Sequence, residues 1–247
     1  MILVVIRSAI FLLWFSSTSV VLSLLFLPLI FLPPRAMRSA AFLWCHATFW
    51  GLRTFAGVRF EVRGEIPREP VLAAAKHMSM WDTIALYALL DKPSIIFKRE
   101  LGRIPFYGWY LRKAEMISID RDGKASALRK MAADAKAVFA QGRCVLIFPE
   151  GTRKKPHAPP DYKPGVAGLY SQIGVPCQPI ALNSGLFWTG PGGFLKKPGT
   201  IVVEFLPLIP PGLKRAEFMS RLQGEIEAAT ANLIREGEGQ LNRRNRH

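Results

Sequence analysis

The sequence predicts an α/β fold with a largely parallel sheet flanked by helices, preceded by a two-helix segment that associates with a membrane. Short apolar runs alternate with helical patterns along the body of the chain, which is typical of parallel sheets with helical crossovers. No charged residue occurs from position 8 to position 34. We therefore expect membrane-anchoring helices in residues 1–57, an α/β domain in 58–236 and a basic, disordered tail in 237–247.

The uncharged run at 8–34 is long enough to cross a bilayer, which takes about 20 apolar residues. A second helix is predicted at 36–57, where aromatic and basic residues alternate as they do at membrane interfaces. The alternatives for the first helix are a cleaved signal peptide and a buried core helix. The sequence leaves open whether it spans the bilayer or forms a half-embedded hairpin with the second.

All the charged residues before Glu61 are arginines. Five arginines come before the first acid, Glu61, and four of them follow the apolar run: the five are Arg7, Arg35, Arg38, Arg53 and Arg59. The positive-inside rule then places the rest of the chain in the cytoplasm. We expect a protein of the cell inner membrane with its α/β domain on the cytoplasmic side.

Seven apolar runs in the body of the chain are predicted to be strands. They lie at 58–62, 71–75, 94–97, 116–119, 144–148, 177–182 and 201–205. Helices are predicted at 83–90, 124–141 and 213–235. In the second of these, Leu128, Met131 and Ala135 follow helical spacing, and Gly142 ends the pattern.

The net charge narrows the class of binding partner. Lys and Arg number 33 against 18 Asp and Glu, a net charge of +15, which suits nucleic acid, anionic lipid or a phosphorylated substrate. The apolar amino terminus favours lipid, so no nucleic acid is expected.

Cys45, Cys144 and Cys177 lack the spacing of a disulfide framework or metal site. They are predicted to be buried free thiols.

The stretch His77-Met-Ser-Met-Trp-Asp82 lies between a predicted strand and a predicted helix. Open α/β sheets place their chemistry at such strand ends. A turn that joins the two side chains would let Asp82 hold one imidazole nitrogen of His77 and free the other to accept a proton. The alternative, a turn or capping pair, is not excluded by this spacing alone.

Three further strand ends carry unusual chemistry. Lys98 and Arg99 begin a stretch with a Pro-x-x-Gly turn, residues 118–121 end in Asp-Arg, and Phe148-Pro-Glu-Gly-Thr-Arg153 forms a compact loop. An arginine fork suits phosphate oxygens. Taken singly, each stretch could instead be an ordinary turn or a surface ion pair.

Together these stretches resemble the 1-acyl-sn-glycerol-3-phosphate acyltransferases, also called lysophosphatidic acid acyltransferases. The matching blocks, in the order of that family, are His77-x-x-x-x-Asp82, Lys98-x-Glu100-Leu101-x-x-x-Pro105-x-x-Gly108, Phe148-Pro-Glu-Gly-Thr-Arg153 and Val175-Pro176-x-x-Pro179-Ile180. They span residues 77–180. The chain departs from the common pattern at Lys76, where many members carry Asn, and at Cys177-Gln178, where aliphatic residues are more usual.

The resemblance implies transfer of a fatty acyl group from acyl-CoA or acyl carrier protein (acyl-ACP) to the sn-2 hydroxyl of 1-acyl-sn-glycerol-3-phosphate, giving phosphatidic acid. His77 would be the general base and Asp82 would orient it. Arg153 would bind the phosphate of the acceptor with help from Lys98 and Arg99.

In the same loop, Glu150, Gly151 and Thr152 complete the predicted substrate-binding set, and Glu150 would order the loop or touch the glycerol. No cofactor or metal is implied beyond the acyl donor. The alternatives are a sibling enzyme acting on glycerol-3-phosphate, a lyso-ornithine lipid or another lysophospholipid, and a non-catalytic basic membrane-binding protein. The motifs distinguish neither the donor nor the exact acceptor.

Overall fold

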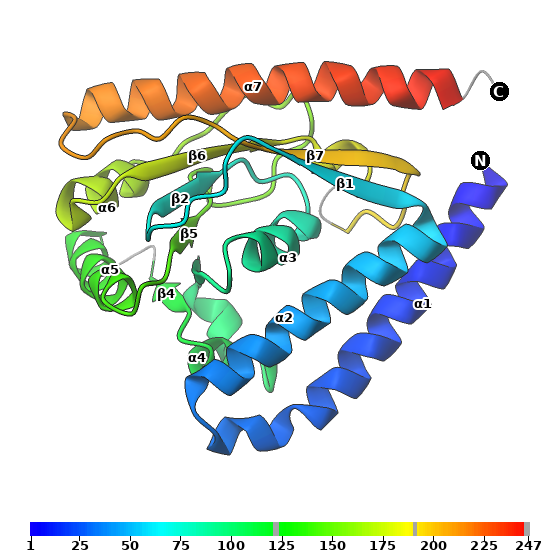
Figure 1. The fold of residues 1–247 in the computed structure, drawn as a ribbon, viewed down its shortest axis with the longest axis horizontal. Helices are drawn as coiled ribbons and strands as arrows, with labels where there is room; N and C mark the ends of the chain where they lie inside the picture. The colour runs from blue at the N-terminus through cyan, green and yellow to red at the C-terminus, as the bar shows by residue number, and fades with distance from the viewer. Residues whose placement is uncertain (121–123, 190–191, 245–247) are drawn as a thin grey trace.

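The computed structural model describes residues 1–120, 124–189 and 192–244, and its centre is a seven-stranded sheet (Figure 1). The strands are β1 Val58–Arg63, β2 Leu72–Ala75, β3 Ser94–Lys98, β4 Ile117–Ile119, β5 Val145–Ile147, β6 Cys177–Leu182 and β7 Gly199–Phe205. Each falls on one of the predicted apolar runs. The spatial order is β1-β7-β6-β2-β5-β3-β4, and every neighbouring pair is parallel except β6 and β7. The predicted α/β fold is confirmed.

Helices connect the strands and cover the sheet. They are α1 Ile2–Leu25, α2 Pro34–Gly51, α3 Met80–Leu89, α4 Tyr107–Lys113, α5 Lys124–Phe139, α6 Gly165–Ile173 and α7 Arg215–Arg244. Shorter helical turns occur at Leu27–Phe31, Leu52–Ala56, Arg99–Arg103 and Ser184–Leu186. The structure confirms the helices predicted near 83–90, 124–141 and 213–235. It adds α6, whose nine residues are too few to show a clear helical period.

The two faces of the sheet pack into separate cores. In β2 all four residues are buried, and alternate side chains face opposite ways. Ala73 and Ala75 belong to the core beneath α2 and α3, whereas Leu72 and Ala74 belong to the core beneath α5, α6 and α7. Figure 1 shows α7 along one face and α3 with α2 on the other. Because the central strands are buried on both faces, they read as continuous apolar runs in the sequence.

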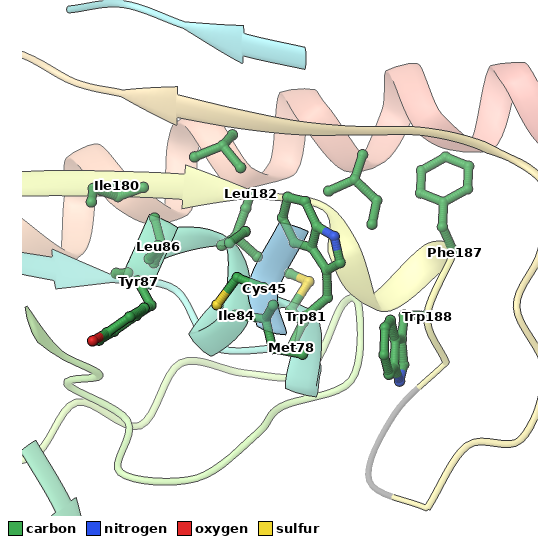
Figure 2. Packing of buried hydrophobic residues seen from close by; sticks show 14 of the residues in the cluster. Cys45, Met78, Trp81, Ile84, Leu86, Tyr87, Ile180, Leu182, Phe187 and Trp188 are labelled. Carbon is green, nitrogen blue, oxygen red and sulfur yellow. The ribbon is translucent and has the colours of Figure 1, made fainter. Parts of the chain in front are cut away.

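The first core joins the amino-terminal helices to the α/β domain. Figure 2 shows Cys45 of α2 among side chains from α3 and β6, with Phe187 and Trp188 beside them. Cys45 is buried, as are Cys144 and Cys177, and all three thiols are free. The expectation of buried free thiols is confirmed.

The helices α1 and α2 form an antiparallel hairpin along one side of the molecule (Figure 1). Within the described residues, α1 is the one helix long and apolar enough to cross a membrane, and only 11% of its apolar window is buried. A core helix of a soluble protein would be mostly buried. Leu13 and Val20, for example, are 70% and 59% exposed. This exposed apolar surface is consistent with membrane association.

The prediction of a disordered tail from residue 237 is wrong for 237–244, because α7 continues to Arg244. Gln240 accepts a hydrogen bond from the backbone N–H of Thr200 (3.2 Å), and Leu241 packs against the first core. Gly237 lies so close to Leu186 that an added Cβ would come within 2.6 Å of its Cδ1. These contacts hold the last turns of the helix against the sheet. The remaining tail residues, 245–247, lie outside the described residues.

Candidate active site

Three strand ends bring the predicted site residues to one edge of the sheet, and a fourth strand ends there as well. Strands β2, β3, β5 and β6 are mutually parallel, so their carboxyl ends meet at the same edge. His77 follows β2, Lys98 ends β3, and the loop from Phe148 to Arg153 follows β5. Ser184 follows β6 at this edge as well. Residues far apart in sequence therefore share one side of the molecule.

The turn after β2 brings His77 and Asp82 into contact. Ser79 is the N-cap of α3, and Asp82, at the third helical position, completes a capping box with it. This fold of the backbone places Asp82 Oδ2 2.9 Å from Nδ1 of His77. The spacing of five residues, which a continuous helix would separate, is thus closed by a helix start.

Asp82 is fully buried and is held by several hydrogen-bond donors. The N–H groups of Met78 and Ser79 donate to Oδ2 at 2.6 and 2.8 Å. The hydroxyls of Ser79 (3.1 Å) and Ser184 donate to Oδ1. Such donors stabilise a buried carboxylate in its charged form. The carboxylate of Asp82 is therefore held in one orientation beside the imidazole.

The imidazole of His77 is fixed on its other sides. Its ring stacks on Phe148 with centroids 3.9 Å apart and planes inclined by 19°. The backbone N–H of Lys154 donates to the carbonyl of His77 (2.8 Å). With Nδ1 directed at Asp82, Nε2 has no hydrogen-bond partner in the part of the chain that the structure describes. That nitrogen is available to accept a proton from a substrate.

Lys76, at which the chain departs from the family pattern, forms a buried ion-pair network. Its Nζ lies 2.9 Å from Glu150 Oε1 and 2.8 Å from Glu227 Oε1 of α7. Tyr162 donates a further hydrogen bond to Glu227 (3.0 Å). Burial raises the pKa of Glu150, and the bond to Lys76 opposes that shift. Glu150 also accepts from the N–H of His77 (3.4 Å), which favours a role in ordering the loop over contact with glycerol.

Arg153 lines a cavity of about 300 Å³, and Met80, from the turn between His77 and Asp82, lines it as well. We call it the Arg153 cavity; its walls include Arg153, Lys196, Met80, Phe11, Trp188 and Phe194. Within residues 1–120, 124–189 and 192–244, Arg153 forms no hydrogen bond or ion pair. Its guanidinium lies near Tyr107. Burial raises the pKa of the Tyr107 hydroxyl, and the positive charge of Arg153 opposes part of that rise.

The other predicted phosphate-binding residues lie on more open surface. Lys98 pairs with Glu100 at 3.6 Å and Arg99 pairs with Asp120 at 2.6 Å, and more than half of each cation's side chain is exposed. Neither lines the Arg153 cavity. Thr152 is exposed, and Gly151 has a φ of 64°, a conformation that favours glycine. Arg121, the last residue of the 118–121 stretch, lies outside the described residues.

Two residues of this edge were not predicted from the sequence. Ser184 is 102 positions from Asp82, the carboxylate to which it donates, and an isolated serine after a strand carries no recognisable motif. Lys196 is a buried lysine in a loop before β7. Its sequence neighbours, Leu195 and Lys197, give no indication of its burial.

Comparison with known proteins identifies the family. The model of the family described as "Acyltransferase" matches residues 58–183. A 1-acyl-sn-glycerol-3-phosphate acyltransferase of Pseudomonas aeruginosa is 38% identical over 208 residues, which cover 82% of this chain and 80% of that protein. The chain belongs to the acyltransferase family. The resemblance seen in the four sequence blocks is thereby confirmed.

Other acyltransferases are similar over parts of the chain or in fold. A lyso-ornithine lipid O-acyltransferase of P. aeruginosa is 33% identical over 138 residues, 55% of this chain and 52% of that protein. The crystal structure of the 1-acyl-sn-glycerophosphate acyltransferase PlsC from Thermotoga maritima superposes with a TM-score of 0.76. It covers 92% of this chain and 96% of its own at 21% identity, so this likeness shows the fold.

Proposed function

We propose that this acyltransferase moves a fatty acyl group from a thioester donor to the sn-2 hydroxyl of 1-acyl-sn-glycerol-3-phosphate. The observation that carries the proposal is the His77–Asp82 pair beside a cavity lined by Arg153, which has no ion-pair partner among the described residues. The similarity to the P. aeruginosa enzyme of that activity supports it. The product would be phosphatidic acid.

His77 is the general base of the proposed reaction. Nε2 takes the proton of the acceptor hydroxyl while its oxygen attacks the thioester carbonyl carbon. The C–S bond then breaks, and the imidazolium returns the proton to the departing thiolate. Asp82 stabilises the imidazolium and keeps Nε2 directed at the hydroxyl, as the aspartate of a hydrolase triad does. A positioned base of this kind contributes about 10²- to 10⁴-fold to the rate.

The acceptor's phosphate would lie against Arg153, because a guanidinium offers paired donors to phosphate oxygens. Lys98 and Arg99, at the neighbouring strand end, would add positive charge near the entrance once their surface pairs with Glu100 and Asp120 exchange for the ligand. Glu150, Gly151 and Thr152 would hold the loop that presents Arg153.

Two features support a reaction at a membrane surface. The exposed apolar face of α1 offers a contact with lipid, and the arginines that follow it favour the cytoplasmic side of the cell inner membrane. The acceptor would come from the bilayer and the donor, acyl-CoA or acyl-ACP, from the cytoplasm. No metal or other cofactor takes part in the proposed steps.

An acceptor panel tests the proposal. Membranes that contain the protein are incubated with radiolabelled acyl-CoA or acyl-ACP and, separately, with 1-acyl-sn-glycerol-3-phosphate, lyso-ornithine lipid, other lysophospholipids and glycerol-3-phosphate. We expect label in phosphatidic acid, and at least a 100-fold loss in His77→Ala. If label appears only in the product of another acceptor, that acceptor and not 1-acyl-sn-glycerol-3-phosphate is the substrate. Full activity in His77→Ala would remove the proposed base.

A further inference from the structure

A second cation, Lys196, lies in the wall of the Arg153 cavity. Its side chain enters from the loop before β7, and the residue is only 3% exposed. Trp188 and Phe11 lie beside its Nζ, which is 4.7 and 5.7 Å from their ring centroids. Figure 2 shows Trp188 at the margin of the first core, on the stretch that leads from β6 towards this loop. A charged amino group is thus surrounded mainly by apolar side chains.

No carboxylate neutralises Lys196 among the residues that the structure describes. Its Nζ donates to two backbone carbonyls, those of Gly193 and Phe194, both at 3.1 Å. A lysine ammonium has three N–H donors, so one donor is left over. Burying a charge without a partner is costly, and burial lowers the pKa of Lys196 to about 8.

Arg153 faces the same cavity and also lacks an ion-pair partner in the described part of the chain. Two uncompensated cations in one largely apolar hollow repel each other, and an anion between them would remove that cost. Met80, which begins α3 and lies within the His77–Asp82 turn, lines this cavity. An anion held there would therefore lie beside the catalytic base.

We infer that Lys196 is a second phosphate-binding residue, which holds the acceptor's phosphate together with Arg153. This inference rests on the proposed function, because it assigns the phosphate of that acceptor to the cavity. Lys196 supplies its spare N–H and its charge, and the rings of Phe11 and Trp188 cover its amino group. The cavity volume equals that of about ten water molecules, enough for a phosphoglycerol headgroup.

Neighbouring lysines provide a matched pair of variants. Lys196→Met removes the charge but keeps an aliphatic chain between Phe11 and Trp188, and Lys197→Met removes an exposed charge next to it. In Lys196→Met we expect the KM for 1-acyl-sn-glycerol-3-phosphate to rise about 10- to 100-fold, because a hydrogen bond to a charged group is lost. The KM of the donor should stay unchanged. Lys197→Met should match the wild type.

Direct binding separates this inference from the proposed function. Binding of 1-acyl-sn-glycerol-3-phosphate to the full chain in detergent is measured by calorimetry, without donor. Weaker binding in Lys196→Met than in Lys197→Met supports the site even if no acyl transfer to this acceptor occurs. Equal binding by the two variants would overturn the inference even if acyl transfer does occur. The inference would also fail if Lys196→Met weakened the binding of monoacylglycerol, which has no phosphate, as much as the binding of 1-acyl-sn-glycerol-3-phosphate.

The pH dependence gives a test that does not rely on a methionine variant folding. Arg153 and Lys196 are the two ionisable side chains in the lining of the Arg153 cavity. Acceptor kcat/KM of the wild type should therefore fall as pH rises past about 8, where Lys196 loses its proton. Lys196→Arg keeps the positive charge, so its acceptor kcat/KM should fall less than that of the wild type as pH rises past about 8. An identical alkaline limb in both proteins would contradict a role for Lys196.

Discussion

At the scale of single residues, the proposed catalytic pair, His77 and Asp82, depends on partners that fix the carboxylate. Among the residues that the structure describes, no lysine or arginine pairs with Asp82, and the one group that could become a cation beside it is the imidazole of His77. The charge of Asp82 is balanced by backbone N–H groups at the start of α3 and by the hydroxyls of Ser79 and Ser184. Ser184 links this helix start to the end of β6, so it sets the direction of the carboxylate relative to the sheet.

Ser184→Ala tests that positioning role. One donor to Asp82 is lost while the two backbone donors remain, so we expect kcat to fall about tenfold or more without being abolished. The acceptor KM should stay unchanged, because Ser184 is not part of the Arg153 cavity. Steady-state kinetics measures both constants. Ser171→Ala, which removes a hydroxyl bonded to a helix carbonyl on α6, is the control, and equal kcat values for the two variants would refute the role.

The sequence predicted those site residues that belong to local motifs and missed those that join the site from a distance. His77 and Asp82 could be paired because a helix start brings them together within six residues. Ser184 and Lys196 could not be found, since their positions depend on how β6 and α1 pack against the domain. A lysine is rarely buried, and only the docking of Phe11 against Trp188 encloses Lys196.

At the scale of elements, Lys76 joins three segments of the fold. It follows β2, and its two carboxylate partners lie on the loop after β5 and on α7. The loop that carries Arg153 is thus tied to the sheet and to the carboxyl-terminal helix.

The seven strands were predictable because their apolar runs are local. The order of the strands and the full length of α7 were not, because Gln240 and Leu241 are held by contacts with distant residues.

Lys76→Met should destabilise the protein by about 3–5 kcal/mol at pH 7, because it leaves Glu150 buried without its cation. Burial already raises the pKa of Glu150, and loss of Lys76 raises it further. A carboxyl whose pKa is raised on folding binds its proton more tightly in the folded state, so its penalty is absent at acid pH and grows as pH rises. The deficit should therefore be smaller at pH 5 than at pH 7.

Chemical denaturation in detergent at the two pH values measures this deficit. Lys163→Met is the control, because Lys163 pairs with Asp161 on exposed surface and its loss should leave the unfolding free energy unchanged. The same deficit at both pH values, or none, would show that Glu150 is not left charged and unpaired in the variant. Adding Glu150→Gln to Lys76→Met should recover part of the loss.

At the scale of the whole molecule, the hairpin of α1 and α2 has an inner side that packs on the α/β domain and an outer side that is exposed. Its inner side docks on the domain: Phe11 meets Trp188 edge to face at 5.4 Å, and Ser8 Oγ accepts from the N–H of Lys196 (2.8 Å). Its outer side is apolar and exposed. The lining of the Arg153 cavity includes Phe11 and Phe15 of α1 as well as residues of the domain, so under the proposed function an acceptor would enter the cavity along this helix.

Charges placed on the outer side of α1 should release the protein from membranes without unfolding it. Leu13→Glu and Val20→Glu change exposed positions, and each charge in the apolar layer costs up to about 3 kcal/mol. We expect binding to phosphatidylcholine–phosphatidylglycerol vesicles, measured by sedimentation, to fall at least tenfold for each variant, with unchanged circular dichroism. Leu208→Glu, an exposed leucine between β7 and α7, should bind like the wild type. If the α1 variants sediment as the wild type does, the membrane contact lies elsewhere, and the acceptor would need another route into the cavity beside His77.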